Sequence, residues 1–195
     1  YTNSLYVVIE GAVCVHLDDE VPPKASVTLG QGAFFGEMGL ISGRRRAATV
    51  SAVGDVLLLE VPRRRMIALR ASVAAVRESM DREAIARSIQ AHLAPGLDRE
   101  SIDDIAATAT IHSWAKGRVL FNEGEDGDSL HLIRSGSVLV RKKIGDHDVV
   151  LNYVAAGNCV GEMAMVSGEP RNATVAAAAD CETIRIERDD FERLM

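Results

Sequence analysis

Apolar and polar positions alternate in short runs over much of the chain. Residues 5–9 and 13–15 are apolar, β-branched stretches separated by Gly11, and the same arrangement recurs around Gly136. Residues 56–61 form a further apolar run. Short runs of this kind, bounded by glycine, are typical of β-strands. Many short strands at this spacing predict a β-sandwich or a jelly roll.

The period of the apolar positions changes between residues 63 and 93, where steps of three and four dominate. The apolar positions there are Met66, Leu69, Val73, Val76, Met80, Ile85, Ile89 and Leu93. This spacing predicts amphipathic helix with a break near residues 79–81, ended by Pro95-Gly96. Asp98 is a candidate cap for a second helix that runs to about Ala107.

The chain repeats itself at an offset of 125 residues. Residues 4–66 align with residues 129–191 without a gap, and 18 of the 63 positions are identical. The identities gather on glycines and on one glutamate and one arginine, residue types that a shared hydrophobic pattern would not select. We therefore infer a duplicated domain that carries a duplicated site.

The strongest motif lies inside this repeat. The first copy reads Phe35-Gly36-Glu37-Met38-Gly39-Leu40 and then Arg46-Ala47-Ala48-Thr49-Val50. The second reads Val160-Gly161-Glu162-Met163-Ala164-Met165 and then Arg171-Asn172-Ala173-Thr174-Val175. Both resemble the phosphate-binding cassette of cyclic-nucleotide-binding domains. The tandem arrangement is similar to the two-domain regulatory subunits of cyclic-AMP-dependent protein kinase.

The residue types suit that ligand. A buried phosphate needs a permanently charged, directional partner, which arginine supplies, and a glycine-rich turn lets backbone N–H groups approach the anion. A glutamate can accept a hydrogen bond from a ribose 2′-hydroxyl. The resemblance implies that Arg46 and Arg171 bind the phosphate, and that Glu37 and Glu162 bind the hydroxyl. The expected close contacts come from Gly36, Gly39, Ala48, Gly161, Ala164 and Ala173, and the expected sites also include Met38, Ala47, Met163 and Asn172.

Plainer interpretations compete with this one. Taken alone, Gly36 or Gly161 could belong to an ordinary turn. Glu37 and Arg46 could be a surface ion pair that contributes little to stability. Recurrence of the pair at one offset, in one glycine context, argues against that. In this family an alanine directly after the arginine goes with cyclic AMP, which favours cyclic AMP at Ala47. Asn172 leaves the preference of the second site open, and cyclic GMP remains a candidate ligand there.

Charge and residue composition argue against several classes of function. The formal charge of −6 disfavours a chain built to coat nucleic acid or an anionic membrane, and no apolar run is long enough to span a bilayer. Three cysteines without a C-x-x-C pair fit a reducing compartment, so we expect a cytoplasmic protein. The histidines lack metal-site spacing, and no nucleophile motif is present. We expect no enzyme and no metal.

The expected fold is mainly β with helices: two β-jelly-roll cyclic-nucleotide-binding domains joined by a helical linker. The expected boundaries are 1–62 for the first domain, 63–97 for the connecting helices and 98–195 for the second domain. The first copy lacks counterparts of residues 112–125, so we expect a segment of a longer protein. The expected function is to sense a cyclic nucleotide and control an effector domain or subunit outside this segment.

Three alternatives remain. The chain could be an interaction module with one or both cassettes degenerate, or the sensory part of a transcription regulator. A jelly-roll enzyme is a third alternative, with no catalytic set to support it.

Overall fold

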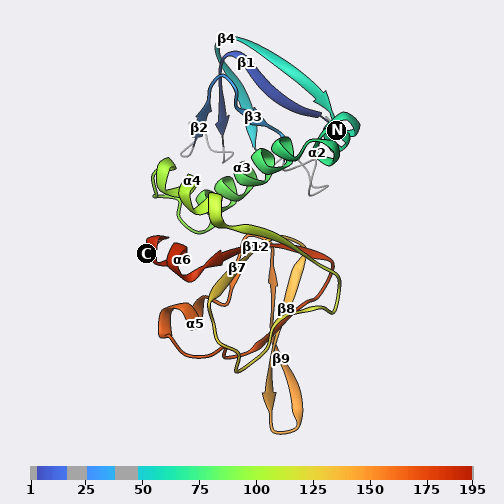
Figure 1. The fold of residues 1–195 in the computed structure, drawn as a ribbon, viewed down its shortest axis with the longest axis vertical. Helices are drawn as coiled ribbons and strands as arrows, with labels where there is room; N and C mark the ends of the chain where they lie inside the picture. The colour runs from blue at the N-terminus through green and yellow to red at the C-terminus, as the bar shows by residue number, and fades with distance from the viewer. Residues whose placement is uncertain (1–3, 17–25, 38–47, 195) are drawn as a thin grey trace. The chain divides into compact units, whose positions relative to one another are not determined.

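The computed structural model describes residues 4–16, 26–37 and 48–194. The chain divides into two compact units, residues 1–78 and residues 79–195. Each unit is built around antiparallel β-sheet (Figure 1). None of the described helices is long and apolar enough to cross a lipid bilayer.

The first unit is a four-stranded sheet followed by a helix. Its elements are β1 (Ser4–His16), β2 (Ser26–Leu29), β3 (Phe34–Phe35), β4 (Thr49–Pro62) and α2 (Arg63–Ser72). β1 is the central strand, because β2, β3 and β4 all pair with it. The register between β1 and β4 shifts near Gly11, whose φ is 78°. A Cβ at Gly11 would lie 2.2 Å from the carbonyl oxygen of Asp55, so only glycine permits this bulge.

The second unit carries two four-stranded antiparallel sheets that face each other. Its helices are the C-terminal part of α3 (Ala74–His92), α4 (Arg99–Thr108), α5 (Glu162–Ser167) and α6 (Arg188–Leu194). Its strands are β5 (Thr110–Trp114), β6 (Val119–Phe121), β7 (Ser129–Ser135), β8 (Ser137–Ile144), β9 (His147–Ala155), β10 (Cys159–Val160), β11 (Thr174–Ala177) and β12 (Cys181–Glu187). The sheet orders are β10-β7-β12-β5 and β6-β11-β8-β9. The expected jelly-roll type of fold is confirmed.

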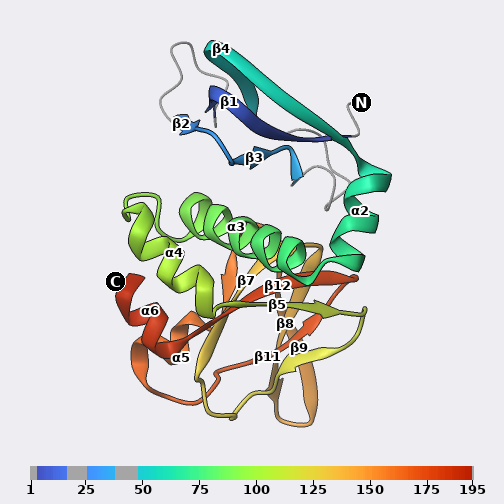
Figure 2. The ribbon, with the colours of Figure 1, turned by 45° about the horizontal axis from the view of Figure 1, so that its top comes forward.

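Two hydrophobic clusters sit on opposite faces of the β7–β12 sheet. Side chains on one face, such as Leu132 and Ile184, pack against Ile89 of α3 and Ile105 of α4. Helices α3 and α4 cover that face in Figure 2. The other face points into the sandwich, where Phe121, Ile133 and Val175 form the second cluster.

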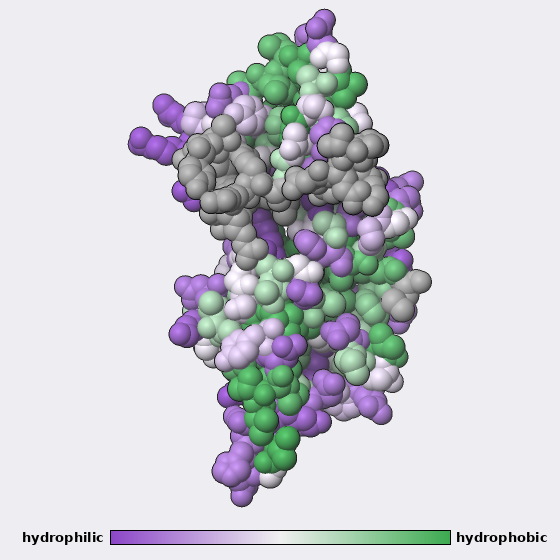
Figure 3. Space-filling view, turned by 180° about the vertical axis from the view of Figure 1, so that it is seen from behind, coloured by the Kyte–Doolittle hydropathy of each residue, from purple (hydrophilic) through white to green (hydrophobic). Residues whose placement is uncertain are grey.

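The β8–β9 hairpin leaves large apolar side chains in solvent. Ile144 is 58% exposed, Leu151 is 53% exposed and Tyr153 is 65% exposed. The hairpin projects at the lower end of Figure 1, and the space-filling view shows a hydrophobic area there (Figure 3).

The structure confirms the duplication. β3 and β10 begin 125 residues apart, at Phe34 and Cys159. β4 begins at Thr49 and β11 at Thr174, again 125 residues apart. The strands on either side of the cassette positions therefore begin at corresponding residues in the two copies.

The predicted helices form, with one correction. The predicted break near residues 79–81 is wrong: α2 ends at Ser72, Val73 is extended, and α3 continues through residues 79–81. Met80 is 4% exposed, so the buried face of α3 simply carries on across that point. Asp98 caps α4 as expected, because its carboxylate accepts a hydrogen bond from the Ser101 N–H at 3.0 Å.

Candidate functional site: the phosphate-binding cassette

The second cassette is a turn and a short helix between β10 and β11. Gly161 adopts a left-handed conformation with φ 91° and precedes α5. Gly168, with φ 71°, ends the helix. The chain then passes Arg171 and enters β11 at Thr174.

Gly161 lies directly against the Arg171 guanidinium. A Cβ at position 161 would lie 2.4 Å from Nη1 of Arg171, closer than non-bonded atoms can approach. The left-handed backbone and the close approach both require glycine here. The glycine of the motif therefore makes room for the arginine of the motif.

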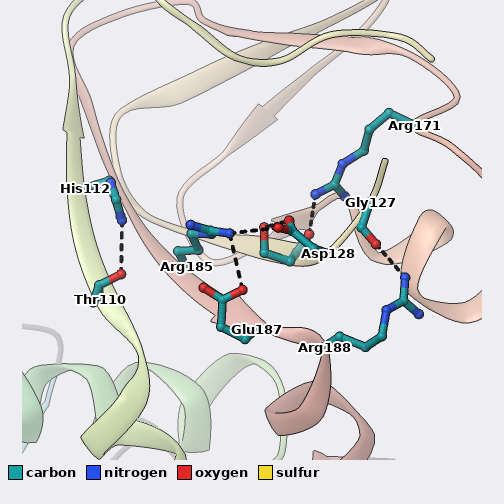
Figure 4. Close-up of polar contacts among 9 residues, drawn as sticks. Thr110, His112, Gly127, Asp128, Arg171, Arg185, Glu187 and Arg188 are labelled. Atoms are coloured by element: carbon teal, nitrogen blue, oxygen red, sulfur yellow. Dashed lines mark hydrogen bonds and ion pairs between the residues drawn. The ribbon is translucent and has the colours of Figure 1, made fainter. Parts of the chain in front are cut away.

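Arg171 is a buried cation that donates only to backbone carbonyls. Its side chain is 4% exposed. Nη1 donates to the carbonyl of Gly161 at 2.8 Å, and Nη2 donates to the carbonyl of Ser129 at 2.5 Å. Figure 4 shows the Arg171 side chain beside Gly127 and Asp128. The guanidinium carbon lies 4.2 Å from the centre of the Phe121 ring, which adds a cation–π contact.

The charge of Arg171 is not neutralised by a direct ion pair. Among residues 79–194, all of which the structure describes, no carboxylate lies within ion-pair distance of it, and its buried Nε has no hydrogen-bond partner. Desolvation lowers the pKa of Arg171, and the carboxylates of Asp128 and Glu125 oppose this from farther away. Such a group favours the arrival of an anion.

Glu162 and its neighbours line the same turn. Glu162 is half-buried and makes no hydrogen bond or ion pair with any residue that the structure describes. Ala164 is buried, and a Cβ on Gly127 would lie 2.4 Å from its own Cβ, so small residues are needed on both sides. Ala173 is buried beside the arginine, whereas Asn172 and Met163 are exposed.

The first cassette is described in part. Gly36 has φ 87° and Glu37 is fully buried, so this copy repeats the left-handed glycine before the glutamate. Ala48 is half-buried just before β4. The remaining expected members lie outside the described residues: Met38, Gly39, Arg46 and Ala47.

Arg188 is a member of the site that the sequence reasoning missed. From the start of α6 it donates to the Met165 carbonyl at 3.1 Å and to the Gly127 carbonyl at 2.5 Å (Figure 4). It thereby ties α5 to the turn that precedes β7. The signal was present, because Arg188 is identical to Arg63 at the 125-residue offset.

A comparison with family models decides the family. The model described as "Cyclic nucleotide-binding domain" matches residues 1–73 and 111–195. The chain belongs to the cyclic nucleotide-binding domain family. Among solved structures, the regulatory domain of Toxoplasma gondii PKA with cAMP is 29% identical, with a TM-score of 0.57. That match covers 99% of this chain and 74% of the other.

Two further solved structures resemble this chain. The regulatory subunit of a cAMP-independent protein kinase A from Trypanosoma brucei is 22% identical with a TM-score of 0.55, covering 97% of this chain and 68% of the other. The sensor domain of the transcriptional regulator DNR from Pseudomonas aeruginosa is 19% identical with a TM-score of 0.54, covering 58% and 77%. At these identities the likeness concerns the fold, so the ligand must be argued from this chain's own residues.

Proposed function

We propose that both cassettes bind a cyclic nucleotide. In the second unit Arg171 pairs with the phosphate and Glu162 accepts a hydrogen bond from the 2′-hydroxyl. Arg46 and Glu37 have the same roles in the first unit. The chain acts by binding a regulatory ligand, and it is not an enzyme.

The observation that carries this proposal is the state of Arg171. Arg171 is 4% exposed and has no carboxylate partner among residues 79–194, so its guanidinium is costly to bury. Its two carbonyl contacts fix its direction without neutralising its charge. A phosphodiester next to it would supply the missing negative charge and acceptors for its remaining N–H groups.

Glu162 supports a ligand with a ribose. Its carboxylate is half-buried beside Arg171's turn and accepts no hydrogen bond from the described residues. A carboxylate in this position can accept from a hydroxyl that is presented along with the phosphate. The same geometry disfavours the alternative of a degenerate interaction module for the second copy, because both charged groups are retained.

Cyclic AMP is the ligand we favour. The Toxoplasma gondii relative was solved with cAMP. Ala47 in the first copy fits the pattern that goes with cyclic AMP in this family. Asn172 is exposed, so it is free to contact a ligand or solvent, and cyclic GMP remains the second candidate for the second unit.

We further propose that binding controls an effector by a shift in conformation. The segment between the cassettes is helical, from Arg63 to Ser72 and from Ala74 to His92, rather than a flexible tether. Helices can carry a rearrangement of one cassette along the chain. The effector would be a domain or subunit outside these residues, as a kinase catalytic subunit would be for a regulatory subunit.

The test is the affinity of the second site for cyclic AMP. Arg171→Ala should weaken that site by at least about 2 kcal/mol, or roughly 30-fold, because a charge-assisted contact is lost and the phosphate is left underpaired. The matched control is Arg141→Ala, since Arg141 is an arginine of the β8–β9 hairpin paired only with Asp148. An unchanged affinity in Arg171→Ala, measured by calorimetry, would show that the arginine has another role.

A further inference from the structure

The second unit contains a cavity next to the cassette but not part of it. The cavity has a volume of about 290 Å³ and lies among residues of β5, β6, β7 and β12. Arg171 belongs both to its wall and to the cassette, whereas Gly161, Glu162 and Ala164 do not line it. The cavity and the proposed phosphate site thus share one guanidinium.

The histidine, the threonine and the arginine of this cavity are specific to the second copy. At the 125-residue offset His131 corresponds to Tyr6, Thr183 to Leu58 and Arg185 to Glu60. The first copy folds the same strands without these groups. The histidine, the threonine and the arginine are therefore not needed by the fold itself.

A hydrogen-bonded chain fixes His131 in the cavity wall. The Trp114 indole N–H donates to Oγ1 of Thr183 at 2.9 Å, and Oγ1 lies 3.1 Å from Nδ1 of His131. The indole can only donate, so Oγ1 of Thr183 accepts from it. Among residues 79–194 Nδ1 of His131 is the only acceptor within hydrogen-bond distance of the Thr183 hydroxyl, so the hydroxyl proton is assigned to that contact. The proton of His131 is then on Nε2, which has no hydrogen-bond partner in the second unit.

His131 therefore brings to the cavity an N–H that has no acceptor among the side chains and backbone of residues 79–194. Its side chain is 5% exposed and lines the cavity. Burial, with the nearby Arg171 charge, lowers the pKa of His131 to about 4, so the ring is neutral at physiological pH. A ligand acceptor in the cavity would replace water at this N–H.

The rest of the lining offers a flat aromatic surface and a mouth with a negative formal charge. His112 and Trp114 are stacked, with ring centroids 5.9 Å apart and planes 23° apart. The mouth carries the exposed carboxylates of Glu125, Asp126 and Asp128 against two arginines, a formal balance of −1 from three carboxylates and two guanidiniums.

Arg185 is held by carboxylates, and Arg171 serves the proposed phosphate site. Arg185 donates to Asp128 and to Glu187, each at 3.2 Å, and Figure 4 shows it reaching from β12 toward them. Arg171 donates to two carbonyls. Asp126, in contrast, makes no hydrogen bond or ion pair with a described residue, so its carboxylate can accept from a ligand N–H or O–H.

We propose that this cavity is a second ligand site, which binds a neutral heteroaromatic ring of the nucleobase or nucleoside class. Such a ring offers a flat face to the His112 and Trp114 wall, an acceptor to Nε2 of His131 and donors to Asp126. Binding there is coupled to the cassette through Arg171, which lines both. The inference does not depend on cyclic nucleotide binding to the cassette.

The test uses adenosine as the probe, in the absence and in the presence of saturating cyclic AMP. Trp114 is the only tryptophan of the chain, so its fluorescence reports on this cavity directly. We expect a saturable change in Trp114 fluorescence, with matching heat in calorimetry, that persists when cyclic AMP is saturating. Adenosine that binds in the cassettes themselves would be displaced by cyclic AMP, and that result overturns the proposal.

Two variants locate the site. His131→Phe keeps the ring but removes the donor, and it should weaken adenosine binding at least about tenfold. His147→Phe, at an exposed position that begins β9, should leave it unchanged. If His131→Phe does not fold, Asp126→Asn at the exposed mouth replaces it, and we expect the same loss of adenosine affinity. Asp146→Asn in the β8–β9 turn is its control and should leave that affinity unchanged.

The outcomes separate this site from the cassettes. No saturable signal in the natural chain, or full affinity in a folded His131→Phe or Asp126→Asn variant, overturns the proposal. The chain could also bind adenosine in a way that depends on His131 and yet bind no cyclic nucleotide. That result would support the cavity as a ligand site and reject the proposed function.

Discussion

His131 lies in an environment very different from that of its free side chain. It is packed among Phe121, Trp114 and His112, with Arg171 and Arg185 close enough to oppose a positive charge, and Asp128 weakly favouring one. Burial is the largest cause of the lowered pKa, which is about 4 against an ordinary 6.5. The folded protein therefore excludes a proton that the unfolded chain accepts between these values.

The consequence is a loss of stability in mild acid. Below pH 6.5 the unfolded state binds more protons at this position than the folded state, so the free energy of unfolding falls as pH falls. The slope approaches about 1.4 kcal/mol per pH unit between pH 6 and 5. Above pH 5, this fall in the free energy of unfolding should be absent from His131→Phe. Urea unfolding at several pH values measures it, and parallel profiles for the two proteins would contradict the assigned pKa.

At the scale of the element, the turn into α5 depends on Gly161. Gly161→Ala places a methyl group on a left-handed residue and against Nη1 of Arg171. We expect a loss of about 1–2 kcal/mol of stability from the backbone, and displacement of the guanidinium that weakens cyclic AMP binding.

Gly168→Ala is the matched control for the other end of α5. Gly168 is also left-handed, with φ 71°, but a Cβ there meets no atom within 4 Å. It should lose similar stability while it keeps the affinity for cyclic AMP. Thermal unfolding and calorimetry on both variants separate backbone strain from damage to the site, and equal affinities in the two would reject the role of the Gly161 contact.

Sequence patterns predict some of the contacts and element boundaries described above, but not others. The 125-residue repeat identified Gly161, Glu162 and Arg171 as one constellation, and the structure confirms that Gly161 and Arg171 touch. Arg188 was missed because its partners are backbone carbonyls, which leave no side-chain pattern in a sequence. The break at Val73 was missed because the apolar spacing runs through it.

The sequence could not predict the contacts among Trp114, His131 and Thr183 inside the sandwich, for a different reason. Trp114 and Thr183 are 69 residues apart, and His131 and Thr183 are 52 apart. Only the register of β12 with β5 and β7 brings them onto one face. Trp114 is partly buried and packs against the inner cluster.

At the scale of the whole molecule, the proposed control of an effector predicts that ligand changes the distance between the units. Nitroxide labels on Val53→Cys in β4 and Leu151→Cys in β9 occupy exposed positions, with Cys14 and Cys159 replaced by serine. Saturating cyclic AMP should shift the distance distribution in pulsed electron spin resonance, because each cassette rearranges around the phosphate. The same distribution with and without ligand would reject the proposed shift.

The most direct test of the account is the number of cyclic AMP molecules that the chain binds. Calorimetric titration should give two sites in the natural chain and one in each of Arg46→Ala and Arg171→Ala, since each variant removes the phosphate partner of one cassette. A single site that Arg171→Ala leaves intact would mean that the second cassette is a relic. No heat and no thermal stabilisation with cyclic AMP or cyclic GMP would contradict the proposed function outright.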